Sequence, residues 1–183
     1  MNELITWVDE NDTVIGYGEK LETHRKEQLH RAFSLFVYNR CTGTLLLHRR
    51  APGKYHSGGL WTNSCCSHQR QGEQLREAVI RRAGQELGLF FAPEELAHPA
   101  DGLRELGHFR YYQRYTDLAE HEVDHVFLIL LDRPQVALNP DPGEMDMVQW
   151  ITPDALDAWL AQRPEEFTAW FARAYALVRP CLP

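Results

Sequence analysis

Apolar and polar positions alternate along the chain in a way that predicts several short strands. Apolar runs with the length and composition of strands occur at residues 4–8, 32–38, 44–48, 104–112, 123–131 and 145–150. The run from Val126 to Leu131 is unbroken, so its strand should be central and buried. A turn is expected at Asn11–Asp12 and a hairpin around residues 39–43.

Helices are predicted where apolar residues recur at helical spacing. Residues 72–87 form an amphipathic pattern that ends at Gly88. A second helix is expected over residues 152–160, where a threonine cap precedes a proline, and a last helix over residues 164–178. Residues 19–31 are polar and partly helical in composition. Because strands dominate the middle and helices flank them, the pattern predicts α/β layers around a mixed sheet.

Length and composition bound the class of protein. With 183 residues, 44% of them hydrophobic and 25% charged, the chain is expected to be one soluble globular domain. Its apolar runs are too short to cross a bilayer, and no basic region leads into an apolar stretch near its first residues, so no membrane span or signal peptide is expected. Four cysteines without a C-x-x-C spacing, two of them adjacent, favour free thiols in a reducing cytoplasm.

The charge balance argues against a nucleic-acid partner. Nineteen basic residues against 26 acidic ones give a net charge of −7, which would repel a phosphate backbone. The basic residues are nonetheless grouped locally, as Arg49, Arg50 and Lys54 and again as Arg81 and Arg82. A few cations that converge in a pocket can bind a small anion, although ordinary surface charge explains each of them equally well.

Three separate stretches carry side chains that suit a metal beside an acid/base pair. One contains Cys66 and His68, another supplies two glutamates at residues 120–122, and the earliest contains His24 and His30. Imidazole and carboxylate bind divalent cations, while a thiol and a carboxylate can exchange protons. In extended strands, residues two apart share one face of a sheet. The two early histidines are six apart, about 240° on an ideal helix, so their stretch must be irregular if both bind one ion.

A helix motif follows these residues. Glu73 and residues 81–89, RRAGQELGL, resemble the Nudix box, whose helical glutamates hold the divalent ions that drive diphosphate hydrolysis. Arg82 stands where the first helical glutamate is expected and Gln85 replaces the first of a glutamate pair, so Glu86 remains alone. The helix is therefore expected to be kept and its hydrolytic chemistry lost, and the arginine can instead hold a phosphate.

Taken together, these motifs resemble type I isopentenyl diphosphate isomerase, a Nudix-fold family that interconverts isopentenyl and dimethylallyl diphosphate. The matching residues run from Lys20 to Trp170. The resemblance implies an α/β (α+β) class and a single domain, with a Nudix-like mixed β-sheet sandwiched between helices. Its core should span about residues 30–163, between an N-terminal metal-ligand segment and a C-terminal helix that covers the active site. The expected partner is a small isoprenoid diphosphate, without nucleic acid or membrane, and the expected state is a monomer or homodimer.

The resemblance also implies roles for particular residues. Cys66 and Glu122 would be the catalytic pair, and Tyr111 would hydrogen-bond the catalytic glutamate, with Tyr112 and Tyr115 as alternatives. One divalent metal (Mn, Mg or Zn) would be bound by His24, His30, His68, Glu120 and Glu122. Glu86 would help to hold Mg carried by the substrate diphosphate. The residues facing the diphosphate would be Lys20, Arg50, Lys54 and Arg82, and the residue facing the isoprenoid tail would be Trp170.

Other interpretations stay open. Trp170 lies on the apolar side of the last expected helix and suits a core position as well. The histidines expected to be surface or core residues without a ligand role are His48, His56, His98, His108, His121 and His125. The chain could instead be a Nudix hydrolase of a nucleoside diphosphate derivative, or a thiol hydrolase that uses Cys66 and His68. A binding module with structural zinc on Cys65, Cys66 and His68 is a further alternative.

Overall fold

The computed structural model describes residues 3–98 and 102–183, and within them one nine-stranded sheet forms the framework. The strands are β1 (Leu4–Val8), β2 (Val14–Glu19), β3 (His30–Asn39), β4 (Thr44–Arg50), β5 (Trp61–Thr62), β6 (Cys65–His68), β7 (Arg104–Arg114), β8 (Ala119–Leu131) and β9 (Met145–Ile151). The helices are α1 (Lys20–Arg25), α2 (Leu75–Leu87), α3 (Pro93–Ala97), α4 (Pro153–Gln162) and α5 (Phe171–Val178), with 3₁₀ turns η1 (Pro164–Glu166) and η2 (Arg179–Cys181).

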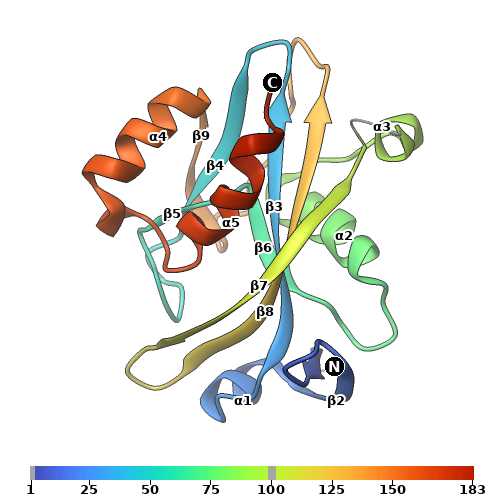
Figure 1. The fold of residues 1–183 in the computed structure, drawn as a ribbon, viewed down its shortest axis with the longest axis vertical. Coiled ribbons are helices and arrows are strands. Elements are labelled where there is room, and N and C mark those ends of the chain that lie inside the picture. Colours follow the sequence, from blue (N-terminus) through green and yellow to red (C-terminus); the bar gives the residue numbers. More distant parts are fainter. Residues whose placement is uncertain (1–2, 99–101) are drawn as a thin grey trace.

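Strand β3 is the centre of the sheet (Figure 1). Along one edge it pairs antiparallel with β1 at His30, then with β6 over residues 32–35, then with β4 over residues 37–39. Along the other edge it runs parallel to β8 over its whole length, with β7 antiparallel beyond. The sheet is therefore mixed, as predicted, and β3 brings strands that are distant in sequence side by side.

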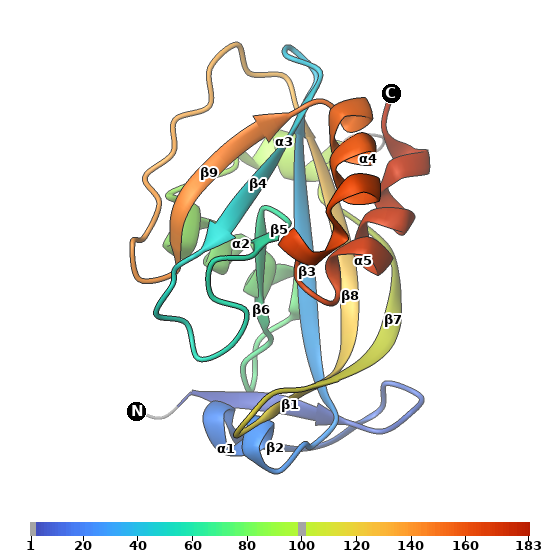
Figure 2. The same cartoon turned by 90° about the vertical axis from the view of Figure 1, so that its left-hand side faces the viewer.

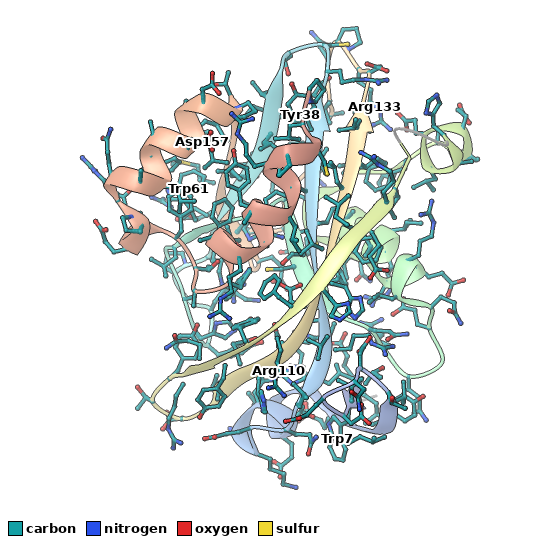
Figure 3. All side chains as sticks on the ribbon, in the orientation of Figure 1. Trp7, Tyr38, Trp61, Arg110, Arg133 and Asp157 are labelled. Atoms are coloured by element: carbon teal, nitrogen blue, oxygen red, sulfur yellow. The ribbon has the colours of Figure 1, made fainter. Side chains whose placement is uncertain are left out.

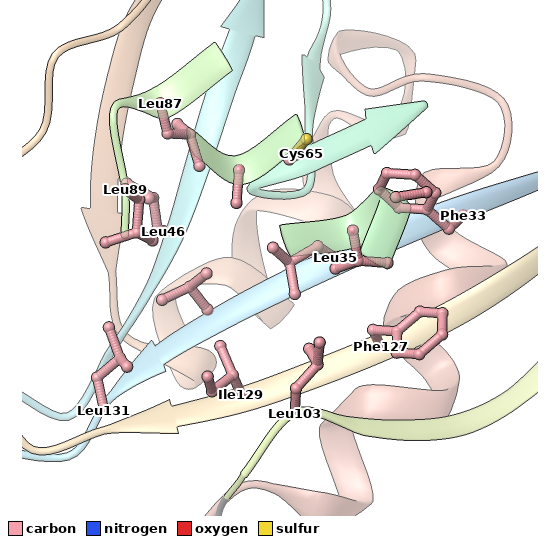
Figure 4. Packing of buried hydrophobic residues seen from close by; sticks show 14 of the residues in the cluster. Phe33, Leu35, Leu46, Cys65, Leu87, Leu89, Leu103, Phe127, Ile129 and Leu131 are labelled. Carbon is pink, nitrogen blue, oxygen red and sulfur yellow. The ribbon is translucent and has the colours of Figure 1, made fainter. Parts of the chain in front are cut away.

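Different helices cover the two faces of this sheet (Figures 1 and 2). Because successive side chains of a strand alternate, Phe33 and Leu35 point into the core beneath α2, which Figure 4 shows from close by. Phe36 and Tyr38 point the other way, into a second core that α4 and α5 cover. Burial of the apolar surface on both faces holds the β3 backbone rigidly in the middle of the molecule.

The N-terminal hairpin of β1 and β2 lies with α1 at one end of the molecule, where Figure 3 labels Trp7. The indole of Trp7 covers two glycines of β2, and a Cβ on Gly18 would lie only 2.1 Å from a ring carbon. Its Nε1 donates to Thr23 Oγ1 at 2.9 Å, and Thr23 Oγ1 donates to the Glu19 carbonyl. The hairpin therefore fixes the position of α1.

The predicted last helix over residues 164–178 is wrong, because the chain is helical only in η1 and again in α5. Between them, Phe167 forms a bridge with Trp61, and Thr168 donates to the Trp61 carbonyl at 3.0 Å. Pairing with β5 thus overrides the helical periodicity of this segment. Among residues 3–98 and 102–183, no helix is long and apolar enough to span a membrane.

Candidate active site

Five buried side chains from four elements converge at the end of the sheet beside α1. His24 comes from α1, His30 from the start of β3, His68 from the end of β6, and Glu120 and Glu122 from β8. One potential ligand atom of each lies within 4.8 Å of the others. The irregular stretch that the six-residue spacing requires is the turn after α1, which a positive φ of 55° at residue 27 helps to close. The structure thus brings together all five metal ligands implied by the sequence.

The hydrogen bonds of the two early histidines define which ring nitrogen is free. Nδ1 of His24 lies 2.6 Å from the Lys20 carbonyl and Nδ1 of His30 lies 2.7 Å from the Gln28 carbonyl. A carbonyl only accepts, so each Nδ1 carries the hydrogen and each Nε2 is left with a lone pair. Both Nε2 atoms are buried without a hydrogen-bond partner among the described residues. Metal-binding imidazoles typically donate their other ring N–H to a carbonyl in this way, so the residues fit a divalent cation.

Burial sets the protonation of this cluster. It lowers the pKa of His30 to about 3 and the pKa of His68 well below the usual range, so both rings are neutral ligands. Burial and the adjacent Glu120 raise the pKa of Glu122 well above normal. Burial also pushes the pKa of Glu120 upward, but the side chains of Glu122, His24 and His56 beside it hold that pKa low.

A pocket opens directly beside the cluster. The ionisable side chains and the tryptophan that line it are Lys20, Arg50, Lys54, Tyr55, His56, Cys66, His68, Arg82, Tyr111, Glu120, Glu122, Asp124, Glu144 and Trp170. The lining includes most of the site residues implied by the resemblance. His24, His30 and Glu86 are buried and do not line the pocket. A concave site with converging charged groups of strongly shifted pKa is the usual appearance of an active site.

Cys66 and Glu122 stand on the two strands that flank β3. Cys66 is opposite Ser34 on β6, and Glu122 is opposite His30 on β8, all on one face of the sheet. Burial raises the pKa of Cys66 to about 12 although Arg50, with Nη1 3.8 Å from the sulfur, opposes this. The thiol is therefore protonated and neutral at rest.

Of three neighbouring tyrosines, Tyr111 reaches the buried glutamate. Its hydroxyl donates to Glu122 Oε2 at 2.6 Å and lies 3.3 Å from a Glu120 oxygen. The hydroxyl of Tyr112 donates to Glu27, and the hydroxyl of Tyr115 bonds that of Ser57. The register of β7 against β8, which places Tyr111 opposite Glu122, explains the selection.

Two comparisons with known proteins agree on the family of this chain. Residues 28–171 match the NUDIX domain family. An isopentenyl-diphosphate Delta-isomerase of Burkholderia multivorans is 43% identical over 171 residues, covering 93% of this chain and 90% of the relative. One of Photobacterium profundum is 38% identical over 181 residues, covering 97% of this chain and 95% of the relative. The chain belongs to the isopentenyl-diphosphate Delta-isomerase family.

The fold of this family member recurs in solved structures of low sequence identity. DR0079 from Deinococcus radiodurans superposes with a TM-score of 0.69 at 24% identity, covering 99% of this chain and 100% of that one. A MutT protein from Methanosarcina mazei superposes with a TM-score of 0.59 at 20% identity, covering 83% of this chain and 94% of that one. These likenesses establish the Nudix-like α/β fold with its mixed sheet in a single domain.

In this isopentenyl-diphosphate Delta-isomerase family member, the degenerate Nudix helix α2 packs on the face of the sheet away from the His/Glu cluster. Glu86 is buried there, accepting from the Cys65 thiol at 3.3 Å and from the Arg82 guanidinium. Arg82 also contacts Glu144 at 3.2 Å, and Glu144 pairs with Lys54 at 2.5 Å. The carboxylate that survives from the box is thus neutralised by an arginine of the same helix.

Trp170 is buried in the interior and also lines the pocket. It immediately precedes α5, and its Nε1 donates to Asn63 Oδ1 at 3.2 Å. The Arg50 guanidinium lies 5.6 Å from the ring centre, and the Tyr111 ring lies 6.1 Å away. The unexpected break in the last helix is what turns this indole toward the pocket.

Several residues of the site were missed from the sequence. His56, expected to be a surface or core histidine without a ligand role, is not among the five clustered side chains, but its Nε2 lies 2.5 Å from Glu120 Oε1, and Tyr55 lines the pocket beside it. Both lie in an irregular loop, where periodicity gives no signal. Asp124, whose pKa burial raises to about 7, was predictable, because it follows Glu122 by two positions in the same strand.

The alternative of a structural zinc site does not fit this geometry. Cys65 and Cys66 are consecutive in β6, so their side chains point to opposite faces of the sheet. Cys65 packs in the core beneath α2, whereas Cys66 and His68 face the pocket. The cation that the cluster can hold is therefore bound by nitrogen and oxygen atoms.

Proposed function

We propose that the protein interconverts isopentenyl diphosphate and dimethylallyl diphosphate. The observation that carries the proposal is that Cys66 and Glu122 line the same pocket, next to a buried His/Glu cluster. Family membership supports the same reaction, because relatives that carry the name isopentenyl-diphosphate Delta-isomerase align with nearly the whole chain.

The reaction needs two groups that exchange protons with neighbouring carbons. The alkene of the substrate is protonated to a tertiary carbocation, and a proton then leaves the adjacent carbon. Cys66 suits the acid that protonates the alkene, because burial keeps its thiol protonated. Glu122 would be the base that takes the departing proton, because a cation held by the cluster would favour its ionised carboxylate. A substrate that lies over β3 would have one of these groups on either side.

We assign the five-residue cluster to one divalent cation, for which Mn, Mg and Zn all match the nitrogen and oxygen donors. The bound cation would supply fixed positive charge that tunes the acidity of Glu122. Tyr111 would hold the remaining oxygen of Glu122 in place through its hydrogen bond of 2.6 Å. The backbone carbonyls that fix His24 and His30 would keep both rings in the ligand tautomer.

The diphosphate would lie among four cations that line the same pocket: Lys20, Arg50, Lys54 and Arg82. Two of them pair with Glu144 in the structure, and the substrate would compete with that carboxylate for them. We further propose that Glu86 helps to bind magnesium only together with the diphosphate. Magnesium takes few protein carboxylates and uses substrate phosphate oxygens, which suits a single glutamate already paired with Arg82.

Trp170 would face the hydrocarbon part of the substrate. Its buried indole closes the pocket beside Tyr111 and Arg50. The face of an indole stabilises a desolvated cation by about 2 kcal/mol, which corresponds to roughly thirtyfold in rate. This stabilisation appears only when the carbocation forms, so it favours the transition state over the bound substrate.

The test is NMR of isotopically labelled isopentenyl diphosphate incubated with the metal-loaded protein and magnesium. We expect the signals of dimethylallyl diphosphate to grow until the two isomers reach a constant ratio, without release of phosphate. Phosphate release in a parallel colorimetric assay would instead identify a Nudix hydrolase. An unchanged spectrum with the metals present would reject the isomerase proposal.

A further inference from the structure

A second group of metal-type side chains lies on the other face of β8, apart from the pocket. Glu105 and His108 of β7 and His125 of β8 each place one potential ligand atom within 4.8 Å of the others. Glu105 Oε1 is 2.7 Å from His125 Nδ1, and the rings of His108 and His125 have centroids 5.0 Å apart. Both histidines were expected from the sequence to have no ligand role.

A β-bulge creates this arrangement. Residues three apart in a regular strand point to opposite faces, yet Glu105 and His108 reach the same neighbour. The register of β7 against β8 shifts between Glu105 and Gly107, where Gly107 has a φ of 135° that favours glycine. The extra residue turns Glu105 onto the face of His108, which pairs directly with His125.

The environment of His125 provides an independent indication of a ligand. The side chain is 8% exposed, and its Nδ1 faces Glu105 while its Nε2 lies 3.0 Å from Asp12 Oδ2. Asp12 has a positive φ of 61° and is clamped by Arg31, which donates to its carboxylate at 2.8 Å and to its carbonyl. A strained, anchored carboxylate behind an imidazole resembles the outer carboxylate of a carboxylate–histidine–metal arrangement.

We propose that Glu105, His108 and His125 form a second divalent-cation site, separate from the His/Glu cluster and suited to zinc. Two imidazoles and one carboxylate form a three-ligand set that leaves one zinc position open to water. The cation replaces the proton between Glu105 Oε1 and His125 Nδ1, and Asp12 holds the far side of the ring. The site joins β7 and β8 to the turn of the N-terminal hairpin, so zinc stabilises the fold by linkage.

Equilibrium dialysis of the full-length protein against micromolar zinc, followed by elemental analysis, tests the site. We expect about two equivalents bound to the native chain and about one to His108→Gln, because one ligand of three is lost. Glu105→Gln should lose the same equivalent, so the result does not depend on the folding of one variant. Exposed His98 lies outside both clusters, and His98→Gln should keep both equivalents.

Thermal unfolding gives a second measurement on the same proteins. Zinc should raise the Tm of the native chain and of His98→Gln by several degrees more than that of His108→Gln. Equal zinc content in the native chain and in both cluster variants would overturn the proposal, as would a single equivalent in all four proteins. All of these residues lie outside the pocket, so isomerisation should persist in every variant, and failure here is separable from failure of the proposed function.

Discussion

At the scale of single residues, neighbouring groups fix the protonation state of the side chains that do chemistry. Backbone carbonyls at 2.6 and 2.7 Å select the tautomer of His24 and His30, and burial keeps Cys66 as a neutral thiol. Tyr111 binds the Glu122 oxygen that the cluster leaves accessible. The side chains proposed as cation ligands and as the acid/base pair are therefore held in defined states by the folded protein.

A buried histidine outside the cation cluster makes stability sensitive to acid. Burial and the nearby Arg50 lower the pKa of His48 to about 4, and Nδ1 donates to the Ser64 carbonyl at 3.1 Å. Because the folded-state pKa lies below the unfolded value, the stability from neutral His48 is present above about pH 6.5 and is lost as the pH falls toward 4. Replacing His48 by Gln should recover about 2 to 3 kcal/mol at pH 4.5 relative to pH 7.5.

Urea unfolding of both proteins at the two pH values measures this difference. His98→Gln, a histidine replaced at an exposed position, serves as the control. An identical loss of unfolding free energy on acidification in the native chain and in His48→Gln would exclude His48 as a source of the acid sensitivity.

The indole of Trp170 should act on turnover more than on binding. In Trp170→Phe the ring keeps its place but has a weaker quadrupole, so we expect kcat to fall about fivefold, or about 1 kcal/mol, with KM nearly unchanged. Loss of the hydrogen bond to Asn63 should lower the Tm by a few degrees. Trp159→Phe is the matched control, because Trp159 Nε1 also donates to a side chain, that of Glu166, but lies outside the pocket. Unchanged turnover per folded Trp170→Phe molecule would assign the residue to stability alone.

At the scale of elements, the hydrophobic pattern predicted the long strands correctly because their alternation reflects burial on two faces. The runs of β3 and β8 fall in the two cores, and α2 begins only three residues after its predicted start. Strand β2 was missed because Gly16 and Gly18 weaken its pattern. Those glycines make room for the indole of Trp7. This contact forms only in the folded hairpin, so the strand pattern alone does not indicate it.

The prediction of the last helix was wrong because of a contact that exists only in the folded protein. Residues 164–178 have helical periodicity, yet the pairing of Phe167 and Thr168 with β5 ends the first turn and sets Trp170 ahead of α5. For the site, the resemblance supplied all five ligands of the cluster, whereas His56 and Tyr55 come from a loop without periodicity. The resemblance thus supplied most of the site residues, and long-range contacts that no local pattern contains decided the rest.

At the scale of the whole molecule, β3 explains why one pocket collects residues from parts of the chain that are far apart in sequence. Its two edges hold β6 and β8 on either side of it, with Cys66 and Glu122 on the same face, and the N-terminal hairpin positions α1 at its end. The net charge of −7 does not prevent the binding of an anion, because Lys20, Arg50, Lys54 and Arg82 line this pocket. Arg49 and Arg81 form ion pairs elsewhere, with Asp146 and Glu73.

The most direct test of the account compares the two adjacent cysteines. Cys66 lines the pocket, whereas Cys65 points into the core beneath α2 and donates to Glu86. We predict that Cys66→Ala loses isomerisation by a factor of at least about a thousand, as expected when a proton-transfer group is removed, while it keeps its fold and its tightly bound cation. Cys65→Ala should lose some stability but retain most of its turnover per folded molecule. Isomerisation by Cys66→Ala at a rate close to that of the native protein would contradict the central claim.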